Sequence, residues 1–304
     1  MSKYIEPLSA TLNGISQVNF LQNPGFGLMI VVGLLFVDVY TAISVLLASL
    51  ISYLIARVLY DDDFAMTGLA AFNSVLLVLM VEAFLGGFSS ILYVIPATMI
   101  VMAIQHLSKV LLEKVNLAYF SIPTVLATYL MLFIHQIWPG VFFSDQLSFK
   151  LTGAFDGLDF SFGNHFFISA SELYLQGTLL FSLVLILAFI IFEKDYLLYL
   201  VCAYFFSIAI FYVLGFAFPL DVMGFTTFNI VLTMMALKAF GFLPMNKEII
   251  LKLFLVTLAV IITKFILDYL LGLIGLPSIV LPFIVVTECV LISRNLKQAR
   301  QVEV

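Results

Sequence analysis

The sequence is poor in charged residues and in cysteine, and each shortage excludes a class of protein. Only 10% of its 304 residues are charged, whereas soluble domains have about a quarter. The two cysteines, Cys202 and Cys289, lie inside apolar runs, so we expect neither a disulfide framework nor a metal site. The net charge of −5 is small and scattered, which argues against nucleic acid as a partner.

Catalytic motifs are also missing from the sequence. Its three histidines, His106, His135 and His165, lie outside the spacings of metal-ligand sets and catalytic triads. It contains no glycine-rich phosphate loop, no His-Glu-x-x-His and no Gly-x-Ser-x-Gly. We therefore predict that the protein is not an enzyme and that it has no cofactor.

Apolar runs dominate the chain, since 63% of its residues are hydrophobic and its mean hydropathy is +1.19. A helix that spans a bilayer needs about 20 mostly apolar residues, and the chain has room for roughly ten such helices. We therefore predict a multi-pass protein of the cell membrane. The basic segment 294–300 is expected in the cytoplasm by the positive-inside rule. With about ten spans, the N-terminus would lie in the cytoplasm too.

The sequence repeats itself at a long period. Residues 68–76 and 224–232 share the pattern Gly-x-x-x-Phe-Asn-x-Val-Leu, which places Phe72 and Phe228 156 residues apart. A repeat of this length sets the architecture, so we predict a duplicated membrane protein. Two weaker matches lie at nearly the same spacing: residues 12–18 with 167–173, and Ser121-Ile122-Pro123 with Val280-Leu281-Pro282.

Five spans in each half would give the two halves opposite orientations in the membrane. We predict an all-α fold of two inverted repeats, each with about five transmembrane helices and one re-entrant helix. Repeats of this kind place the substrate path at their interface, beside broken helices. The predicted division is a first repeat at 1–137, a linker at 138–164, a second repeat at 165–293 and a basic cytoplasmic tail at 294–304.

The segment 11–22 is amphipathic and too short to span a bilayer. Two structures fit it: an interfacial helix on the membrane surface, or a re-entrant helix that ends at Asn23-Pro24-Gly25. Its repetition in the second half favours the re-entrant helix. Non-helical backbone at membrane depth is tolerated only where it is buried in protein or lines a wet cavity.

Polar residues inside apolar runs need a specific interpretation, because they are costly in a membrane. Lys264 and Asp268 stand four residues apart on one expected helix, and we predict a structural ion pair. Asn73 and Asn229 follow the repeated phenylalanines, and we predict hydrogen bonds between helices, a role compatible with a pore. Glu288 fits either packing inside the bundle or a place in a transport pathway.

Together these motifs resemble the urea transporter family. Each half of that family carries Gly-x-x-Gln-Val, Gly-Leu-x-x-(Phe/Tyr)-Asn-x-x-Leu and Leu-Pro-x-x-Thr-x-Pro. Residues 14–18 match the first motif, residues 68–76 match the second, and residues 224–232 match the second with Phe225 in place of its leucine. The third is recognisable at 276–283 and, more faintly, at 121–123.

The resemblance implies a homotrimer in which each protomer carries its own pore between inverted halves. Urea would pass in single file, without energy coupling, through an aromatic slot edged by hydrogen-bond acceptors. By position, the resemblance places Gln17 and Glu172 at the two mouths, and Phe72 and Phe228 beside the midpoint. The slot walls would be Val18, Phe20, Leu76, Leu173 and Leu232, and the midpoint residues Ser121 and Val280.

Departures from the family pattern bear on the substrate. Val280 has no hydroxyl where the family has threonine, and Gln176-Gly177 replaces the Asn-Pro turn in the second half. Glu288 replaces an aromatic residue after the last motif. These changes leave the substrate open between urea and another small planar amide.

The sequence therefore predicts a passive channel, in contact with membrane lipid, for urea or a closely related planar amide. A first alternative is a proton-coupled carrier of small solutes that uses Glu172 or Glu288 as its proton site. A second alternative is a membrane sensor or scaffold that has kept the fold without transporting. Dependence of uptake on a pH gradient would favour the carrier, and absence of flux would favour the sensor.

Overall fold

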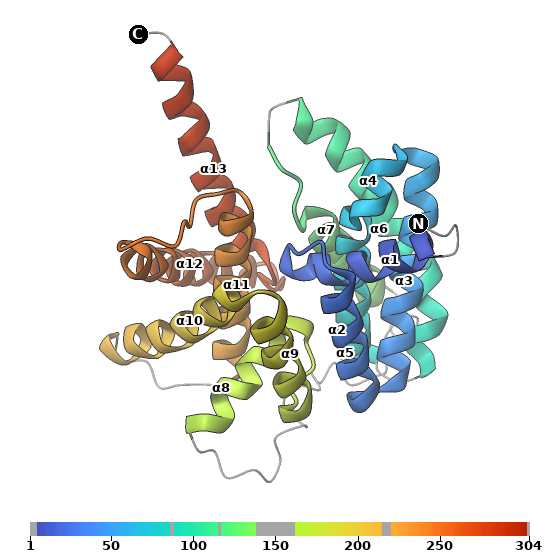
Figure 1. Ribbon diagram of the computed structural model, residues 1–304, viewed down its shortest axis with the longest axis horizontal. Coiled ribbons are helices and arrows are strands. Elements are labelled where there is room, and N and C mark those ends of the chain that lie inside the picture. The colour runs from blue at the N-terminus through green and yellow to red at the C-terminus, as the bar shows by residue number, and fades with distance from the viewer. Residues whose placement is uncertain (1–4, 86–87, 115–116, 138–161, 215–219, 303–304) are drawn as a thin grey trace. The chain divides into compact units, whose positions relative to one another are not determined.

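The computed structural model describes residues 5–85, 88–114, 117–137, 162–214 and 220–302 (Figure 1). Every regular element in these ranges is a helix, so the prediction of an all-α fold is confirmed. A helix satisfies its backbone hydrogen bonds within its own segment, which is what a chain requires where water is absent.

The helices form two similar series, each beginning with a helix, a 3₁₀ turn and a second helix. The first series is α1 (Ile5–Ser16), η1 (Gln17–Asn19), α2 (Pro24–Val37), α3 (Val39–Leu59), α4 (Asp62–Thr67), η2 (Leu69–Ala71), α5 (Phe72–Leu85), α6 (Phe88–Glu113) and α7 (Ile122–Ile137). The second is α8 (Phe162–Ser171), η4 (Glu172–Tyr174), α9 (Leu179–Phe192), α10 (Lys194–Val213), α11 (Leu220–Ala239), α12 (Ile249–Gly272) and α13 (Leu281–Val302).

The residues cluster into two compact units, which we describe separately. The first unit contains residues 1–106 and 123–198, and the second contains 107–122 and 199–304. These units differ from the predicted repeats, because α8 and α9 of the second series belong to the first unit. Residues 138–161, most of the predicted linker, lie outside the described residues, and α13 continues without a break into the predicted tail.

The chain bends sharply between α1 and α2 in the first unit (Figure 1). The segments Glu6–Asn19 and Pro24–Val37 are inclined by 80° to each other. Phe20 ends η1 in the left-handed conformation, and the Asn23 side chain then caps α2 by accepting a hydrogen bond from the Phe26 N–H at 3.0 Å. The predicted helix break is therefore confirmed at this place. The bend fits a broken span as well as a re-entrant helix.

Glycine allows α1 to lie directly on its neighbours. A Cβ at Gly27 would stand 2.0 Å from the Leu12 carbonyl oxygen, so the backbones of α1 and α2 are in contact. Gly68 ends α4 with a φ of 79°, and a Cβ there would stand 2.3 Å from the Gly14 nitrogen. Only glycine fits that conformation and that space. The helix that leads into η1 is thus held by backbone contacts on two sides.

Four helices of the described part are long and apolar enough to cross a membrane: α3, residues Ile91–Glu113 of α6, α10 and α12. The bent pair α1–α2 would be a fifth span. The apolar helices within α5, α7, α9 and α11 are shorter. A helix of 14 residues, such as α5 or α9, covers about 21 Å of a core about 30 Å thick. A membrane pass built on either helix would therefore need non-helical segments to complete it.

Four bulky residues in the described part have a left-handed backbone, and they recur at the spacings of the sequence motifs. Phe20 (φ 55°) and Leu175 (φ 56°) occupy equivalent positions in the two series, and each directly follows a 3₁₀ turn. Phe120 (φ 36°) and Ile279 (φ 47°) are likewise equivalent, and they stand shortly before α7 and α13. Such a conformation costs about 1–3 kcal/mol and persists only when the surroundings fix it. The two series therefore share their turn geometry as well as their order.

One part of the core of the first unit lies between α2 and α9, which pack side by side (Figure 1). The Phe26 ring stacks on the Phe189 ring at 5.5 Å between centroids, with 28° between the planes. A Cβ at Gly33 would meet the Phe181 ring at 3.0 Å, so the helices approach closely there as well. In the second unit, α11, α12 and α13 pack on one another.

Candidate functional site

The predicted mouth residues lie on the two 3₁₀ turns of the first unit. Gln17 begins η1 and is 7% exposed; its side-chain amide donates a hydrogen bond to the Thr67 carbonyl at 2.9 Å. Glu172 begins η4 and is 6% exposed. Both side chains are therefore buried within the first unit, and the Gln17 amide is held by the backbone at the end of α4.

The two turns are joined by a hydrogen bond that sequence reasoning missed. The Asn19 amide on η1 donates to the Tyr174 hydroxyl on η4 at 2.6 Å, and that hydroxyl donates to the Ile15 carbonyl at 3.3 Å. Asn19 and Tyr174 stand at equivalent places in the two repeated turns. That equivalence was the available signal, but it does not say that equivalent residues touch.

Tyr174→Phe should leave the buried Asn19 amide without this acceptor. We expect the free energy of unfolding to fall by about 1–3 kcal/mol, because an unmatched buried donor keeps its full desolvation cost. The double variant Asn19→Leu/Tyr174→Phe removes both partners and should lose less than the two single variants together. Unfolding of the purified protein in detergent measures this, and strictly additive losses would show that the pair is not coupled.

Phe20, a predicted slot wall, and Phe72, a predicted flank of the midpoint, are in contact in the first unit. The rings of Phe20 and Phe72 have centroids 5.5 Å apart and planes inclined by 42°. Carbon atoms in contact are about 3.5–4.0 Å apart, so a flat solute between two parallel rings needs about 7 Å. The rings are therefore in contact with each other here, and any solute between them would have to separate them.

The other predicted wall residues, together with the second predicted midpoint flank, are apolar and fully buried within their own units. No solvent reaches their side chains, so each can serve as core and as the wall of an internal passage. They are Val18, Leu76 and Leu173 in the first unit and Phe228 and Leu232 in the second.

Asn73, next to Phe72 on α5, connects three helices of the first unit. Its side-chain oxygen accepts hydrogen bonds from the Thr124 N–H at 3.3 Å and from the Thr124 hydroxyl at 2.8 Å, near the start of α7. Its amide donates to the Gln105 side chain on α6 at 2.9 Å, and Gln105 donates to the Ala70 carbonyl. Asn73 therefore caps a helix to which it does not belong.

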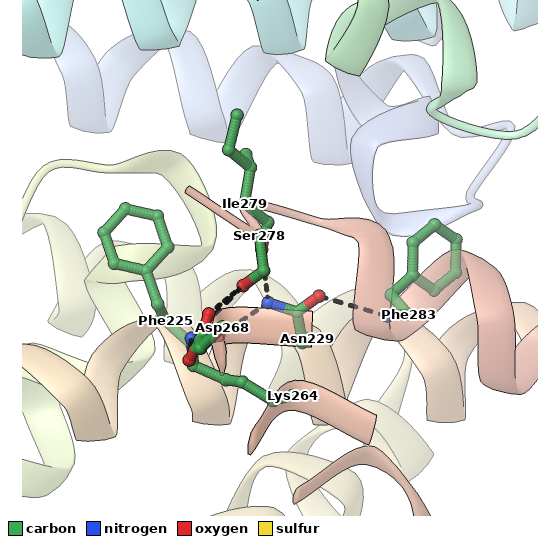
Figure 2. A network of polar contacts seen from close by, with 7 residues as sticks. All are labelled: Phe225, Asn229, Lys264, Asp268, Ser278, Ile279 and Phe283. Atoms are coloured by element: carbon green, nitrogen blue, oxygen red, sulfur yellow. Dashed lines mark hydrogen bonds and ion pairs between the residues drawn. The ribbon is translucent and has the colours of Figure 1, made fainter. Parts of the chain in front are cut away.

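Asn229, next to Phe228 on α11, has the equivalent role in the second unit (Figure 2). Its side-chain oxygen accepts from the Phe283 N–H at 3.1 Å, near the start of α13. Its amide donates at 2.8 Å to the Ile279 carbonyl and to the Phe225 carbonyl of its own helix. The predicted hydrogen bonds between helices are confirmed for both asparagines.

Lys264 and Asp268 form the predicted ion pair on α12, with 2.7 Å between Nζ and Oδ2 (Figure 2). The Lys264 side chain is 12% exposed and that of Asp268 is 41% exposed. A third residue, which was not predicted, completes a triangle: the Ser278 hydroxyl donates to Asp268 Oδ1 and accepts from Lys264 Nζ at 3.4 Å. The pair therefore anchors the segment that leads to Ile279 and Val280.

The two predicted midpoint residues are fully buried in the second unit. Ser121 directly precedes α7, and its hydroxyl has no hydrogen-bond partner among the described residues. Val280 directly precedes α13 and supplies no polar group. The neighbouring Phe120 ring meets the rings of Phe240 and Phe283 edge to face at 5.7 and 5.5 Å. An unsatisfied buried hydroxyl beside an aromatic cluster can bind a small polar ligand or a water.

Glu288 on α13 carries the most unusual polar group of the second unit. Both of its carboxylate oxygens are buried, and neither makes a hydrogen bond of normal geometry within the described residues, although the Ala118 backbone is near enough to interact. The adjacent Thr287 hydroxyl is likewise buried without a partner in the described part. A buried acid so poorly matched is costly, so Glu288 is a candidate for a functional group rather than for packing alone.

The histidines contribute no recognisable centre. His106 packs against the Tyr60 ring at 5.7 Å, and the side chains of His135 and His165 lie outside the described part. Among the side chains that the structure describes, no three of His, Cys, Asp and Glu gather as metal ligands do.

A comparison with protein families gives one match. A family model with the description "Urea transporter" matches residues 8–295 of the chain. The match covers nearly all of both predicted repeats and every candidate residue discussed above. No curated protein matches the chain.

Proposed function

The chain belongs to the urea transporter family, and from that premise we propose that it is a passive channel for urea or a closely related planar amide. It is an all-α polytopic membrane protein, and its family membership assigns it a role in urea transport. The observation that carries the finer proposal is the pair of facing rings, Phe20 on the η1 turn and Phe72 on α5.

A slot between aromatic rings suits the shape of urea. Urea is flat, with four N–H bonds and one carbonyl, so ring faces select it by planarity. Acceptor oxygens must replace the water that it loses, because an unmatched N–H costs several kcal/mol. A ligand of four heavy atoms gains at most about 1.5 kcal/mol per atom, so binding is weak, as fast permeation requires.

Contacts between equivalent helices support the two inverted repeats. A two-fold relation makes contacts reciprocal. At the repeat spacing, Phe26 of α2 is equivalent to Phe181 of α9, and Leu34 of α2 is equivalent to Phe189 of α9. Phe26 packs on Phe189. In the corresponding contact, Phe181 lies against Gly33, which is next to Leu34. Inverted repeats place the substrate path beside their broken helices, where η1 and η4 occur.

The remaining candidate residues receive their roles from the family resemblance. Phe228 is the second aromatic flank, and Ser121 and Val280 are the midpoint, where one hydroxyl is retained. Gln17 and Glu172 supply acceptor oxygens at the mouths, and the apolar walls are Val18, Leu76, Leu173 and Leu232. We place the protein in the cell membrane as a homotrimer with both termini in the cytoplasm.

Solute flux into proteoliposomes tests the proposal. Vesicles shrink in a hyperosmotic gradient and re-swell as the solute enters, which stopped-flow light scattering follows. Rapid re-swelling with urea and slow re-swelling with glycerol, without any ion gradient, is the expected result. Rapid entry of acetamide or formamide with slow entry of urea would change the substrate and keep the channel. Absence of flux with all four solutes would refute the proposal.

Glu172→Gln should retain urea transport, because glutamine keeps an acceptor oxygen of similar reach. Glu172→Leu removes the acceptor, and we expect flux to fall by about tenfold, the effect of about 1.4 kcal/mol. The same scattering measurement compares both variants with the unmodified protein. Equal flux in all three would show that Glu172 is not in the path.

The buried carboxylate of Glu288 favours a second candidate function, a proton-coupled carrier. Such a carrier would accumulate its solute when a pH gradient is imposed, whereas a channel only equilibrates it. Uptake of labelled urea with and without the gradient distinguishes them. Accumulation that Glu288→Gln abolishes would establish the carrier.

A further inference from the structure

Each predicted midpoint residue stands in a turn that its own sequence does not favour. Ser121 follows the left-handed Phe120, and Val280 follows the left-handed Ile279. Phenylalanine and the β-branched isoleucine have no local reason to adopt this conformation. Groups elsewhere in the structure must therefore hold both turns.

In the second unit, Asn229 holds the turn from both ends. Its amide binds the Ile279 carbonyl, immediately before Val280, and its side-chain oxygen binds the Phe283 N–H, three residues after it. Figure 2 shows the bonds of Asn229 to Ile279 and Phe283. Since Val280 lies between these two residues in the chain, one side chain holds the backbone on both sides of it with a donor and an acceptor. Because Asn229 is fully buried, water cannot replace either bond.

The ion pair supplies a second anchor on the same turn. Ser278 is 2% exposed, and its hydroxyl lies between Asp268 and Lys264 of α12. Charges within a candidate membrane span are expensive and need a role. Here both charged groups form hydrogen bonds with Ser278, the residue before Ile279, so the pair holds the start of the turn.

In the first half, uncharged side chains hold the corresponding turn in the same way. Asn73 is the repeat equivalent of Asn229, and its side-chain oxygen accepts a hydrogen bond from the Thr124 N–H. When Ser121 is aligned with Val280, Thr124 is aligned with Phe283. In that same alignment Gln105 takes the place of Lys264, and it supports Asn73 directly.

We infer that Asn73 and Asn229 are positioning residues of the transport pathway, each fixing the start of the helix that follows a midpoint residue. In the second half, the Lys264–Asp268 pair anchors Ser278 and so helps to fix the same turn. It takes no part in proton transport. The inference rests on the proposed function in one respect only: that Ser121 and Val280 lie on the solute path.

Asn229→Ala should make the channel less selective between solutes. We expect the ratio of urea to glycerol permeability to fall by about tenfold, because Val280 is no longer held in one place, and Asn73→Ala should act similarly at Ser121. Thr233→Ala is the matched control: Thr233 is also fully buried on α11, and its hydroxyl donates to the Asn229 carbonyl of its own helix. A loss of folding alone lowers the amount of active protein but not this ratio.

Amide hydrogen exchange at Phe283 provides a readout that needs no transport. Its N–H should exchange faster in Asn229→Ala and at the normal rate in Thr233→Ala. Unchanged exchange at Phe283 would overturn the inference. If the unmodified protein shows no urea flux, the proposed function fails, and faster exchange at Phe283 still supports positioning by Asn229. Normal flux with an unchanged permeability ratio in both asparagine variants would overturn the inference and leave the function intact.

The double variant Lys264→Gln/Asp268→Asn tests the role of the ion pair. It removes both charges and keeps polar partners for Ser278, so we expect the permeability ratio and the flux to be retained. Lys264→Met leaves Asp268 without its partner and should lower the ratio. Loss of all flux in a folded double variant would overturn the assignment of the pair as an anchor.

Discussion

Phe72→Trp should abolish urea flux while leaving the protein folded. Phe72 is 3% exposed and its ring already lies 5.5 Å from that of Phe20, so an indole would leave no room for the two rings to separate around a solute in the proposed passage. We expect flux per mole of folded protein to fall by at least about a hundredfold, which corresponds to a barrier higher by about 2.7 kcal/mol. Stopped-flow scattering on reconstituted protein measures it.

The control for Phe72→Trp is the same substitution at Phe189. That ring is also buried in the first unit, but it packs on Phe26 in the α2–α9 core. Phe189→Trp should cost stability through overpacking, about 1–3 kcal/mol, without lowering flux per folded protein. Flux that is unchanged in Phe72→Trp, with a normal unfolding midpoint, would remove Phe72 from the pathway.

Gly27→Ala should produce the largest loss of stability. The added methyl group would stand 2.0 Å from the Leu12 carbonyl oxygen. Neither atom can rotate away, because the carbonyl belongs to a helix backbone and the position of a Cβ is fixed by its own backbone. We expect a cost of about 3 kcal/mol, at the upper end for overpacking, and an unfolding midpoint in detergent lower by about 5 °C or more.

Gly272→Ala is the matched control, because Gly272 ends α12 and a Cβ there has no atom within 4 Å. It should be neutral or slightly stabilising, since alanine favours helix by up to about 1 kcal/mol. Equal midpoints for Gly27→Ala and Gly272→Ala would mean that α1 and α2 can separate without cost.

The sequence predicted the elements that depend on composition and local chemistry. Apolar runs gave the helical class, and Asn23-Pro24-Gly25 gave the break before α2, because proline and glycine act on their own backbone. The spacing of Lys264 and Asp268 gave the ion pair, since residues four apart face each other on a helix.

What the sequence did not predict depends on contacts between distant segments. Leu175 takes a left-handed conformation that a leucine does not prefer, and nothing near it in the sequence indicates this. Asn73 was expected to bond between helices, but its partners Gln105 and Thr124 follow only from how α5, α6 and α7 pack. The short lengths of α5 and α7 were not predicted, because apolar runs do not show where helix gives way to a turn.

The bond between Asn19 and Tyr174 also has a consequence for descent. A residue that touches its own counterpart in a duplicated chain lies beside the axis relating the copies, where two identical ancestral subunits would have presented the same side chain to each other. The present pair is unlike, a donor facing a hydroxyl. Once the copies were joined in one gene, the two equivalent positions could take different residues that bind each other. Two copies of the first half should no longer replace the whole, since asparagine would then stand in place of Tyr174, whose hydroxyl donates to the Ile15 carbonyl.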